Sequence, residues 1–238
     1  MKILLHEGKE FFWKQGDFHS QYGVIKESKM KKAKNGTIIK THLNRKFLVF
    51  EANFIDELKR IKRGPAIILP KDVGLILAST SINKNSIVLD AGTGSGVLAS
   101  YLAQFVKKVY SYEIRKDFYN LAKDNIEFLN LNNVVLKNKD VYKKIDENNL
   151  DLIVLDLLEP WKALDNAKRA LKKNSYLVAY SPNITQVQEF IKKAQELNFN
   201  IVKVSEVIER EWHVEQLRLR PKSQLIGHTG FLCFIRNL

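Results

Sequence analysis

From residue 66 onward, this chain alternates short strand-like segments with stretches of helical pattern. The strand-like segments are rich in β-branched and aromatic residues, and they span 86–90, 108–113, 133–140, 150–156, 175–181, 200–210 and 229–236. The helical stretches span 95–105, 117–130, 161–173 and 184–197. This alternation predicts an α/β fold with a parallel, doubly wound sheet. Right-handed crossovers would bring the carboxyl ends of its strands to one edge, where such sheets bind ligands.

Residues 1–58 have a different pattern, with five short segments typical of β-strands that predict a small β-barrel or sandwich. The basic segment 59–65 ends in Gly-Pro, which is typical of a boundary. We therefore expect two domains, a small β-rich N-terminal domain (residues 1–62) and a larger α/β domain (residues 63–238).

The charge of the chain indicates a polyanionic partner. Lysine and arginine outnumber aspartate and glutamate by 39 to 26, which gives a formal net charge of +13. Nucleic acid is a better fit than a membrane surface. The alternative is that a compositionally biased genome raises the lysine content of its proteins without any such partner. Four lysines precede the tight-turn signal Asn35-Gly36, at an expected hairpin tip that is either solvated or in contact with nucleic acid: Lys29, Lys31, Lys32 and Lys34.

Several classes of protein are disfavoured by composition. No apolar stretch approaches the roughly 20 residues of a membrane helix, and the N-terminus lacks the apolar run of a signal peptide. We therefore expect a cytoplasmic protein. The single cysteine, Cys233, excludes an internal disulfide and a cysteine-rich zinc site, so we expect no metal. Its apolar neighbours predict a small buried side chain.

A glycine-rich turn, DAGTGSG (90–96), follows the strand-like segment 86–90 and opens a helix. Glycines at 92, 94 and 96 let the backbone turn sharply and approach a ligand closely. The dinucleotide fingerprint would require a glycine at 97, where this chain has Val97. Asp90, before the first glycine, suits a ligand that carries an ammonium group, as S-adenosylmethionine does. The turn therefore favours S-adenosylmethionine over a nicotinamide cofactor.

Four acidic residues end successive strand-like segments: Asp90, Glu113, Asp140 and Asp156. A carboxylate at the end of the second strand can accept hydrogen bonds from both ribose hydroxyls, which is the role expected for Glu113. Asp140 could bind an adenine amino group. The alternative for Asp90 and Glu113 is helix capping or simple solvation of a strand end, and for Asp140 the many polar neighbours favour such an alternative more strongly.

Four sequence motifs together resemble one family. They are PKD (70–72); DAGTGSG with SYE (111–113); LDLLEPW (155–161); and REW (210–212) followed by RP (220–221) and GHTGFL (227–232). With them the chain resembles the TrmI-type tRNA adenine-N1 methyltransferases, which act on T-loop position 58 and in some archaea also on 57. The resemblance covers nearly the whole chain. It implies a Rossmann-like class I methyltransferase domain with a small N-terminal β domain, S-adenosylmethionine as cofactor, tRNA as substrate and a homotetramer.

The resemblance also implies residue roles. It places Ser95, Gly96, Val97 and Leu98 at the cofactor, Glu113 at the ribose, and Asp156 at the reacting methyl group and the target base. The complete set of expected cofactor-binding residues is Asp90, Gly92, Gly94, Ser95, Gly96, Val97, Leu98, Glu113, Asp140 and Asp156. One departure is Leu69, because many relatives carry there an aromatic residue or histidine that could stack on the base.

Asp156 is the expected catalytic residue. Adenine N1 attacks through a ring lone pair, so catalysis depends on alignment and electrostatics and needs no strong base. A carboxylate can accept a hydrogen bond from the exocyclic amino group and stabilise the developing positive charge. Because N1 lies on the Watson–Crick edge, the base must be extracted into the site.

The other residues of the motifs have two interpretations each. Trp161 either walls the site or packs structurally after Pro160, and Glu159 either orients the loop or is solvated. Lys71 and Asp72 either order the cofactor loop or, for Asp72, cap a helix. His228 and His213 are expected to be turn residues that position the sheet or a subunit contact, with a role as general base as the less favoured alternative.

Two other functions are possible from the sequence. A non-catalytic tRNA-binding subunit would keep the fold without the chemistry, and the intact glycine turn with Asp90, Glu113 and Asp156 argues against it. A nicotinamide oxidoreductase is disfavoured by Val97.

Overall fold

The computed structural model describes residues 1–64, 67–215 and 217–238. These residues form two compact units, Met1–Ile61 and Lys62–Leu238, which are described separately below. The predicted boundary segment 59–65 ends at residue 65, which lies outside the described residues. Within the described part of the chain, no helix combines the length and the apolar character needed to cross a bilayer.

The first unit is β-rich, as predicted. Its four-stranded antiparallel sheet has the order β2-β1-β6-β5, and β3 pairs with β4 in a separate hairpin. The strands are β1 (Lys2–His6), β2 (Lys9–Trp13), β3 (Phe18–Ser20), β4 (Gly23–Ile25), β5 (Thr37–Lys40) and β6 (Lys46–Glu51). Leu4, Met30 and Phe47 are fully buried in its core.

The two helices of this unit correct one prediction. They are α1 (Glu27–Lys32) and α2 (Phe54–Leu58). Lys29, Lys31 and Lys32 lie on α1 and not at a hairpin tip. Burial of Met30 against the sheet explains the helix, since it gives this lysine-rich segment one apolar anchor. Gly36, in the left-handed region at φ +78°, turns the chain from α1 into β5.

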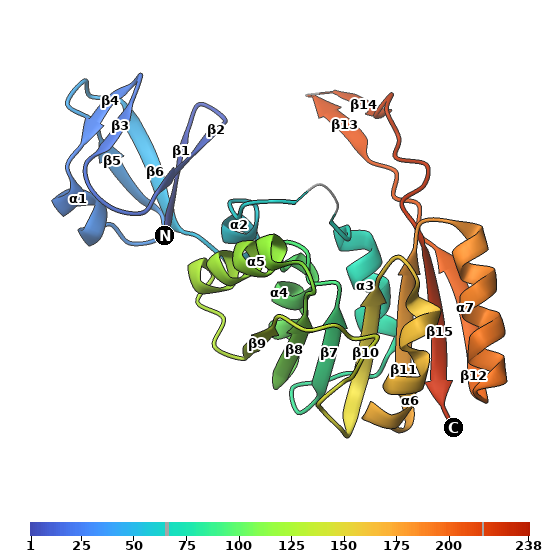
Figure 1. Cartoon of the computed structure of the whole chain (residues 1–238). Helices are drawn as coiled ribbons and strands as arrows, with labels where there is room; N and C mark the ends of the chain where they lie inside the picture. Colours follow the sequence, from blue (N-terminus) through green and yellow to red (C-terminus); the bar gives the residue numbers. More distant parts are fainter. Residues whose placement is uncertain (65–66, 216) are drawn as a thin grey trace. The chain divides into compact units, whose positions relative to one another are not determined.

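The second unit is built on a seven-stranded sheet of order β12-β15-β11-β10-β7-β8-β9 (Figure 1). Its strands are β7 (Ile87–Ala91), β8 (Lys108–Tyr112), β9 (Val134–Lys137), β10 (Leu150–Asp156), β11 (Leu171–Ser181), β12 (Phe199–Glu206) and β15 (Phe231–Asn237). Each predicted strand of this unit is present, and β7 to β11 are mutually parallel. The predicted doubly wound α/β fold is confirmed.

The sheet is not parallel throughout, and this corrects the prediction. β15 is antiparallel to both β11 and β12. The physical reason is the connection from β12 to β15. Its described residues, 207–215 and 217–230, form no helix of the kind that a parallel crossover usually needs. Between these strands the chain forms an additional hairpin that the sequence patterns did not reveal, β13 (Trp212–Glu215) with β14 (Arg218–Pro221).

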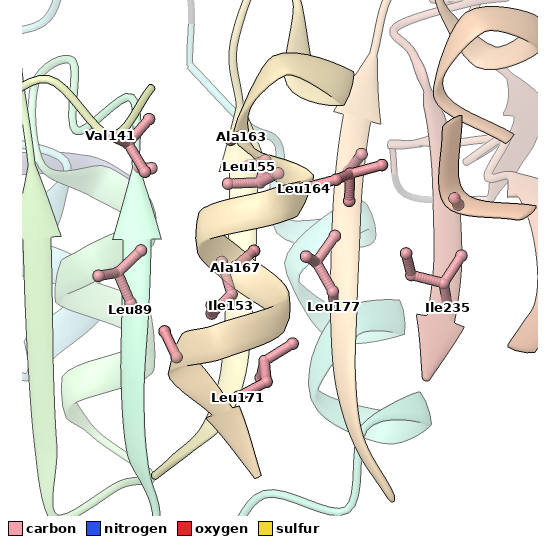
Figure 2. Close-up of a cluster of buried hydrophobic side chains, with 14 of the residues drawn as sticks. Leu89, Val141, Ile153, Leu155, Ala163, Leu164, Ala167, Leu171, Leu177 and Ile235 are labelled. Atoms are coloured by element: carbon pink, nitrogen blue, oxygen red, sulfur yellow. The ribbon is translucent and has the colours of Figure 1, made fainter. Parts of the chain in front are cut away.

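Helices cover both faces of this sheet. They are α3 (Pro70–Ser79), α4 (Val97–Ala103), α5 (Lys116–Phe128), the 3₁₀ helix η1 (Pro160–Ala163), α6 (Leu164–Ala170) and α7 (Ile184–Glu196). Ile76 of α3 and Leu102 of α4 pack on one face, and Leu164 of α6 and Phe190 of α7 pack on the other. Figure 2 shows the second face, where α6 lies over the apolar side chains of β10 and its neighbours.

The strand β10 is buried on both sides, which explains its continuous apolar sequence. Leu152 and Val154 face α3 and α4, whereas Ile153 and Leu155 face α6 and α7. Because side chains alternate along a strand, Asp156 belongs to the face of α3 and α4. Asp90 pairs with Val154 and Tyr180 pairs with Asp156 in parallel register, so these residues share that face.

Candidate active site

The glycine-rich turn connects β7 to α4 and presents Asp90 beneath it. Asp90 is buried, and its Oδ2 accepts a hydrogen bond from the Ser111 hydroxyl at 2.7 Å. Burial raises the pKa of the Asp90 carboxyl to about 7; the bond from Ser111 opposes this shift, and the carboxylates of Asp156 and Glu113 add to it. The second oxygen, Oδ1, is buried without a hydrogen-bond partner among the described residues. An ammonium group would supply the missing donor.

Gly92 brings this turn into contact with the end of β10. Its φ is +94°, and a Cβ built on it would lie 2.0 Å from the backbone oxygen of Asp156. No side chain can occupy that space, so glycine is required here for both reasons. The turn and the strand that carries Asp156 are therefore packed backbone to backbone.

Glu113 directly follows β8 and is almost fully buried. Its Oε2 accepts a hydrogen bond from the Gly94 N–H at 3.0 Å, and its Oε1 accepts one from the Arg115 N–H at 2.9 Å. A carboxylate has about four lone-pair positions, so acceptor capacity for two ribose hydroxyls is left.

Residues 95–98 form the start of α4, as expected. Gly96 is the N-cap and is followed by Val97 and Leu98, both buried. The Ser95 hydroxyl is buried without a partner among the described residues. Sequence reasoning missed Asn125 of α5, whose amide donates to the Ser95 carbonyl at 2.9 Å. This bond stabilises the conformation of the glycine-rich turn.

Asp140 departs from its prediction. β9 ends at Lys137, so Asp140 lies three residues beyond the strand. The chain leaves the sheet because the Asn138 amide donates to the carbonyl oxygens of Glu113 and Ile114, at 2.7 and 3.1 Å. The Asp140 carboxylate accepts from the Tyr142 N–H at 2.9 Å.

A small cavity of about 30 Å³ joins the turn to Asp156. Its lining comprises Ile67, Ile68, Asp90, Gly92, Thr93, Gly94, Ser95, Val97, Leu98 and Asp156. Apolar walls, two unpartnered buried polar atoms (Asp90 Oδ1 and Ser95 Oγ) and the carboxylates of Asp90 and Asp156 fit the chemistry of a cationic nucleoside cofactor. Its volume holds no more than about two water molecules.

Asp156 is the last residue of β10 and is partly buried. Burial raises the pKa of its carboxyl to about 6, and the negative charge of Glu113 adds to the shift. Pro160 begins η1, as predicted, and Trp161 packs against the apolar cluster on the α6 and α7 face. The Glu159 carboxylate pairs with Lys162 at 2.6 Å.

The PKD and GHTGFL segments meet in space. The Lys71 ammonium lies 2.9 and 3.0 Å from the two Asp72 carboxylate oxygens and 2.7 Å from the Thr229 hydroxyl. The helix-cap interpretation of Asp72 is wrong, because Leu69 is the N-cap of α3. His228 precedes this contact and bonds to Glu206 and to the Pro182 carbonyl, the latter at 2.8 Å.

Sequence reasoning also missed a cleft of about 810 Å³ beside this contact. Leu69 and Lys71 form part of its wall, and the remaining lining comes from segments at and around the β13–β14 hairpin: Glu209, Arg210, Glu211, His213, Arg220, Lys222, Ser223, Gln224, Leu225 and Ile226. Figure 1 shows this hairpin extending beyond the sheet. The REW motif (210–212) runs into β13 and the RP motif (220–221) ends β14, so these two motifs were the signal in the sequence.

Among the curated relatives of this chain, two match it over nearly the whole length of both proteins. The chain is 36% identical to the tRNA (adenine(57)-N(1)/adenine(58)-N(1))-methyltransferase TrmI of Methanocaldococcus jannaschii, over 99% of this chain and 94% of that protein. It is also 36% identical to the tRNA (adenine(58)-N(1))-methyltransferase TrmI of Thermus thermophilus, over 93% of this chain and 89% of that protein.

Solved structures agree on the fold. A Thermotoga maritima structure described as an S-adenosylmethionine-dependent O-methyltransferase superposes with a TM-score of 0.87 at 31% identity, over 100% of this chain and 92% of the other. The tRNA (1-methyladenosine 58) methyltransferase TrmI from Aquifex aeolicus superposes with a TM-score of 0.81 at 26% identity, over 100% and 96%. The family model for the tRNA methyltransferase complex GCD14 subunit matches residues 60–220. The chain therefore belongs to the GCD14 family of tRNA methyltransferases.

Proposed function

We propose that this protein transfers a methyl group from S-adenosylmethionine to N1 of adenine 58 in the T-loop of tRNA. The observation that carries this proposal is Asp156, held at the end of β10 against the glycine-rich turn of a GCD14-family chain. The printed activities of the Methanocaldococcus and Thermus relatives support the choice of base and atom.

When bound, the cofactor supplies the sulfonium methyl group. Asp90 would bind its ammonium group through the unpartnered Oδ1, and Glu113 would accept hydrogen bonds from the ribose. Gly92, Gly94, Ser95, Gly96, Val97 and Leu98 would form the floor and wall of the pocket. Asp140 would accept from the adenine amino group with the oxygen that Tyr142 leaves free.

Asp156 would act on the target base. Its ionised carboxylate accepts a hydrogen bond from the exocyclic amino group, which aligns N1 for in-line attack. The same charge stabilises the cationic ring as the new bond forms. The partly buried position strengthens both effects, because the local dielectric is lower than in water.

tRNA would be bound in part by a basic surface on the first unit. Residues 1–61 contain 13 lysines and arginines against 7 aspartates and glutamates, and Lys26, Lys29 and Lys40 line a cleft of about 390 Å³ within this unit. We infer that residues 1–62 form a domain that contributes phosphate contacts and that residues 63–238 form the catalytic domain. Contacts of this kind help to offset the cost of extracting the base.

The direct test is methylation of an unmodified tRNA transcript with labelled donor, followed by mapping of the modified base. We expect 1-methyladenosine at position 58, and none in a matched transcript with uracil at 58. A third transcript with adenine at both positions reports on 57. Label on a ribose hydroxyl or on another base would contradict the assignment, and absence of turnover would favour a non-catalytic subunit.

We also propose a homotetramer. The apolar side chains of the β13–β14 hairpin support it, since Trp212, Val214 and Leu219 are all more than half exposed in the single chain. Exposed apolar residues in such a group are typical of subunit contacts. Light scattering should give four times the chain mass of 27.5 kDa. A monomeric mass would contradict the proposal.

A further inference from the structure

The contact between the PKD and GHTGFL segments contains a buried ion pair that the chemistry above does not use. Lys71 and Asp72 have side chains that are 6% and 0% exposed. Burying two charges is costly and contributes little net stability compared with apolar residues of the same size. The pair therefore calls for an explanation other than stability.

The pair is connected to Thr229, 157 residues away along the chain. The Thr229 hydroxyl accepts from Lys71 at 2.7 Å and donates to Asp72 at 3.2 Å. Each of the three side chains is bonded to the other two. These bonds connect the start of α3 to the segment before β15. Thr229 is the only member of this group outside α3.

Thr229 in turn contacts Tyr180 on β11. Burial raises the pKa of the Tyr180 hydroxyl, a hydrogen bond with Thr229 lowers it, and the charges of Asp72 and Asp156 raise it. The tyrosine thus lies within electrostatic reach of both the ion pair and the expected catalytic carboxylate. Tyr180 and Asp156 are also direct neighbours in the parallel register of β10 and β11.

Gly230 completes the arrangement. A Cβ built on Gly230 would lie 2.6 Å from the Tyr180 ring and 2.9 Å from its hydroxyl oxygen. The ring is therefore pressed against the backbone next to Thr229, and only glycine leaves room for it. A shift of the segment that carries Thr229 would be transmitted directly to Tyr180.

We propose that the buried Lys71–Asp72 pair, acting through Thr229, positions Tyr180 beside Asp156 and so sets the geometry in which the target base meets that carboxylate. This inference rests on the proposed function. Lys71, Asp72 and Thr229 are positioning residues, because each acts through Tyr180. Their loss lowers the turnover number and leaves cofactor affinity nearly unchanged, since none of them lines the cavity at the glycine-rich turn.

The test uses Thr229→Val, which keeps the shape of the side chain and removes the hydroxyl. We expect kcat to fall about 10- to 100-fold, the loss typical of misplaced reacting groups, with an unchanged KM for S-adenosylmethionine. Thr229→Ser should restore most of the turnover. The matched control is Thr80→Val at the other end of α3, where a buried hydroxyl donates to the Ile76 carbonyl at 2.8 Å. The kcat of this variant should equal that of the wild type.

A second variant removes the charges without leaving one unpaired. Lys71→Met combined with Asp72→Leu replaces the pair by apolar side chains, which buried pairs often tolerate without loss of stability. We expect a folded protein with the same low kcat as Thr229→Val. Wild-type turnover on tRNA tests the proposed function separately. If wild-type tRNA methylation is observed and either variant keeps kcat within about twofold of it, the positioning role is refuted. An equal loss in Thr80→Val would also refute it.

Discussion

Replacing Asp156 by alanine is expected to lower kcat on tRNA by about 100- to 1,000-fold, the usual effect of removing one preorganised electrostatic group. The carboxylate lies at the end of β10, where it can meet both the amino group of the base and the developing charge on the ring. Single-turnover methylation of a tRNA transcript measures the change.

A matched variant separates charge from shape at this position. Asp156→Asn keeps the size of the side chain and removes its charge, so it should lose nearly as much activity as the alanine variant. Both variants should still be stabilised against heat by S-adenosylhomocysteine, because Asp90 and Glu113 are retained. Turnover near the wild-type level in either variant would exclude a catalytic role for Asp156.

The same residue sets a pH dependence. Because burial raises the pKa of Asp156 to about 6, the carboxyl becomes neutral as the pH falls through that value. Only the ionised form is active, so kcat/KM, which reports the free enzyme, should decrease by about tenfold per pH unit below that pKa. This acid limb should be absent from the residual activity of Asp156→Asn.

Replacing Gly92 by alanine is expected to destabilise the fold and to abolish cofactor binding. The added methyl group would lie 2.0 Å from the Asp156 backbone oxygen, and the φ of +94° disfavours any L side chain. The free energy of unfolding should fall by about 3 kcal/mol or more, at the severe end for a single substitution. Thermal unfolding with and without S-adenosylhomocysteine measures both effects.

Gly94→Ala is the matched control for stability. Gly94 has a φ of +55°, and a Cβ there would have only the Gly92 carbonyl oxygen within reach, at 3.9 Å. Its free energy of unfolding should therefore fall by only about 1–2 kcal/mol, the cost of the left-handed conformation. Equal destabilisation by the two substitutions would show that the contact between Gly92 and β10 is unimportant.

Local patterns predicted much of the second unit. Apolar strands, the glycine-rich turn and acids at strand ends are encoded by neighbouring residues. The strands β7 to β10 and the positions of Asp90, Glu113 and Asp156 could therefore be predicted from the sequence. Cys233 was also predicted correctly and is fully buried. Asp140 was placed too close to its strand, because Asn138 withdraws the chain from the sheet through bonds to residues about 25 positions away.

The features that were missed depend on contacts between distant residues. The antiparallel direction of β15 follows from a connection whose described residues form no helix, which strand patterns do not reveal. Asn125 braces the Ser95 carbonyl from another helix, and Thr229 meets Lys71 across more than 150 residues. α1 was misread because a single buried methionine, Met30, determines its conformation.

The close grouping of Asp90, Glu113 and Asp156 has one more consequence. With pKa values of about 7 and 6 for Asp90 and Asp156, the free protein holds part of a proton in this cavity at neutral pH. A ligand that brings positive charge expels that proton, whereas a neutral ligand of the same shape does not. Binding and proton release are therefore linked, and the pocket discriminates between ligands by their charge as well as by their fit.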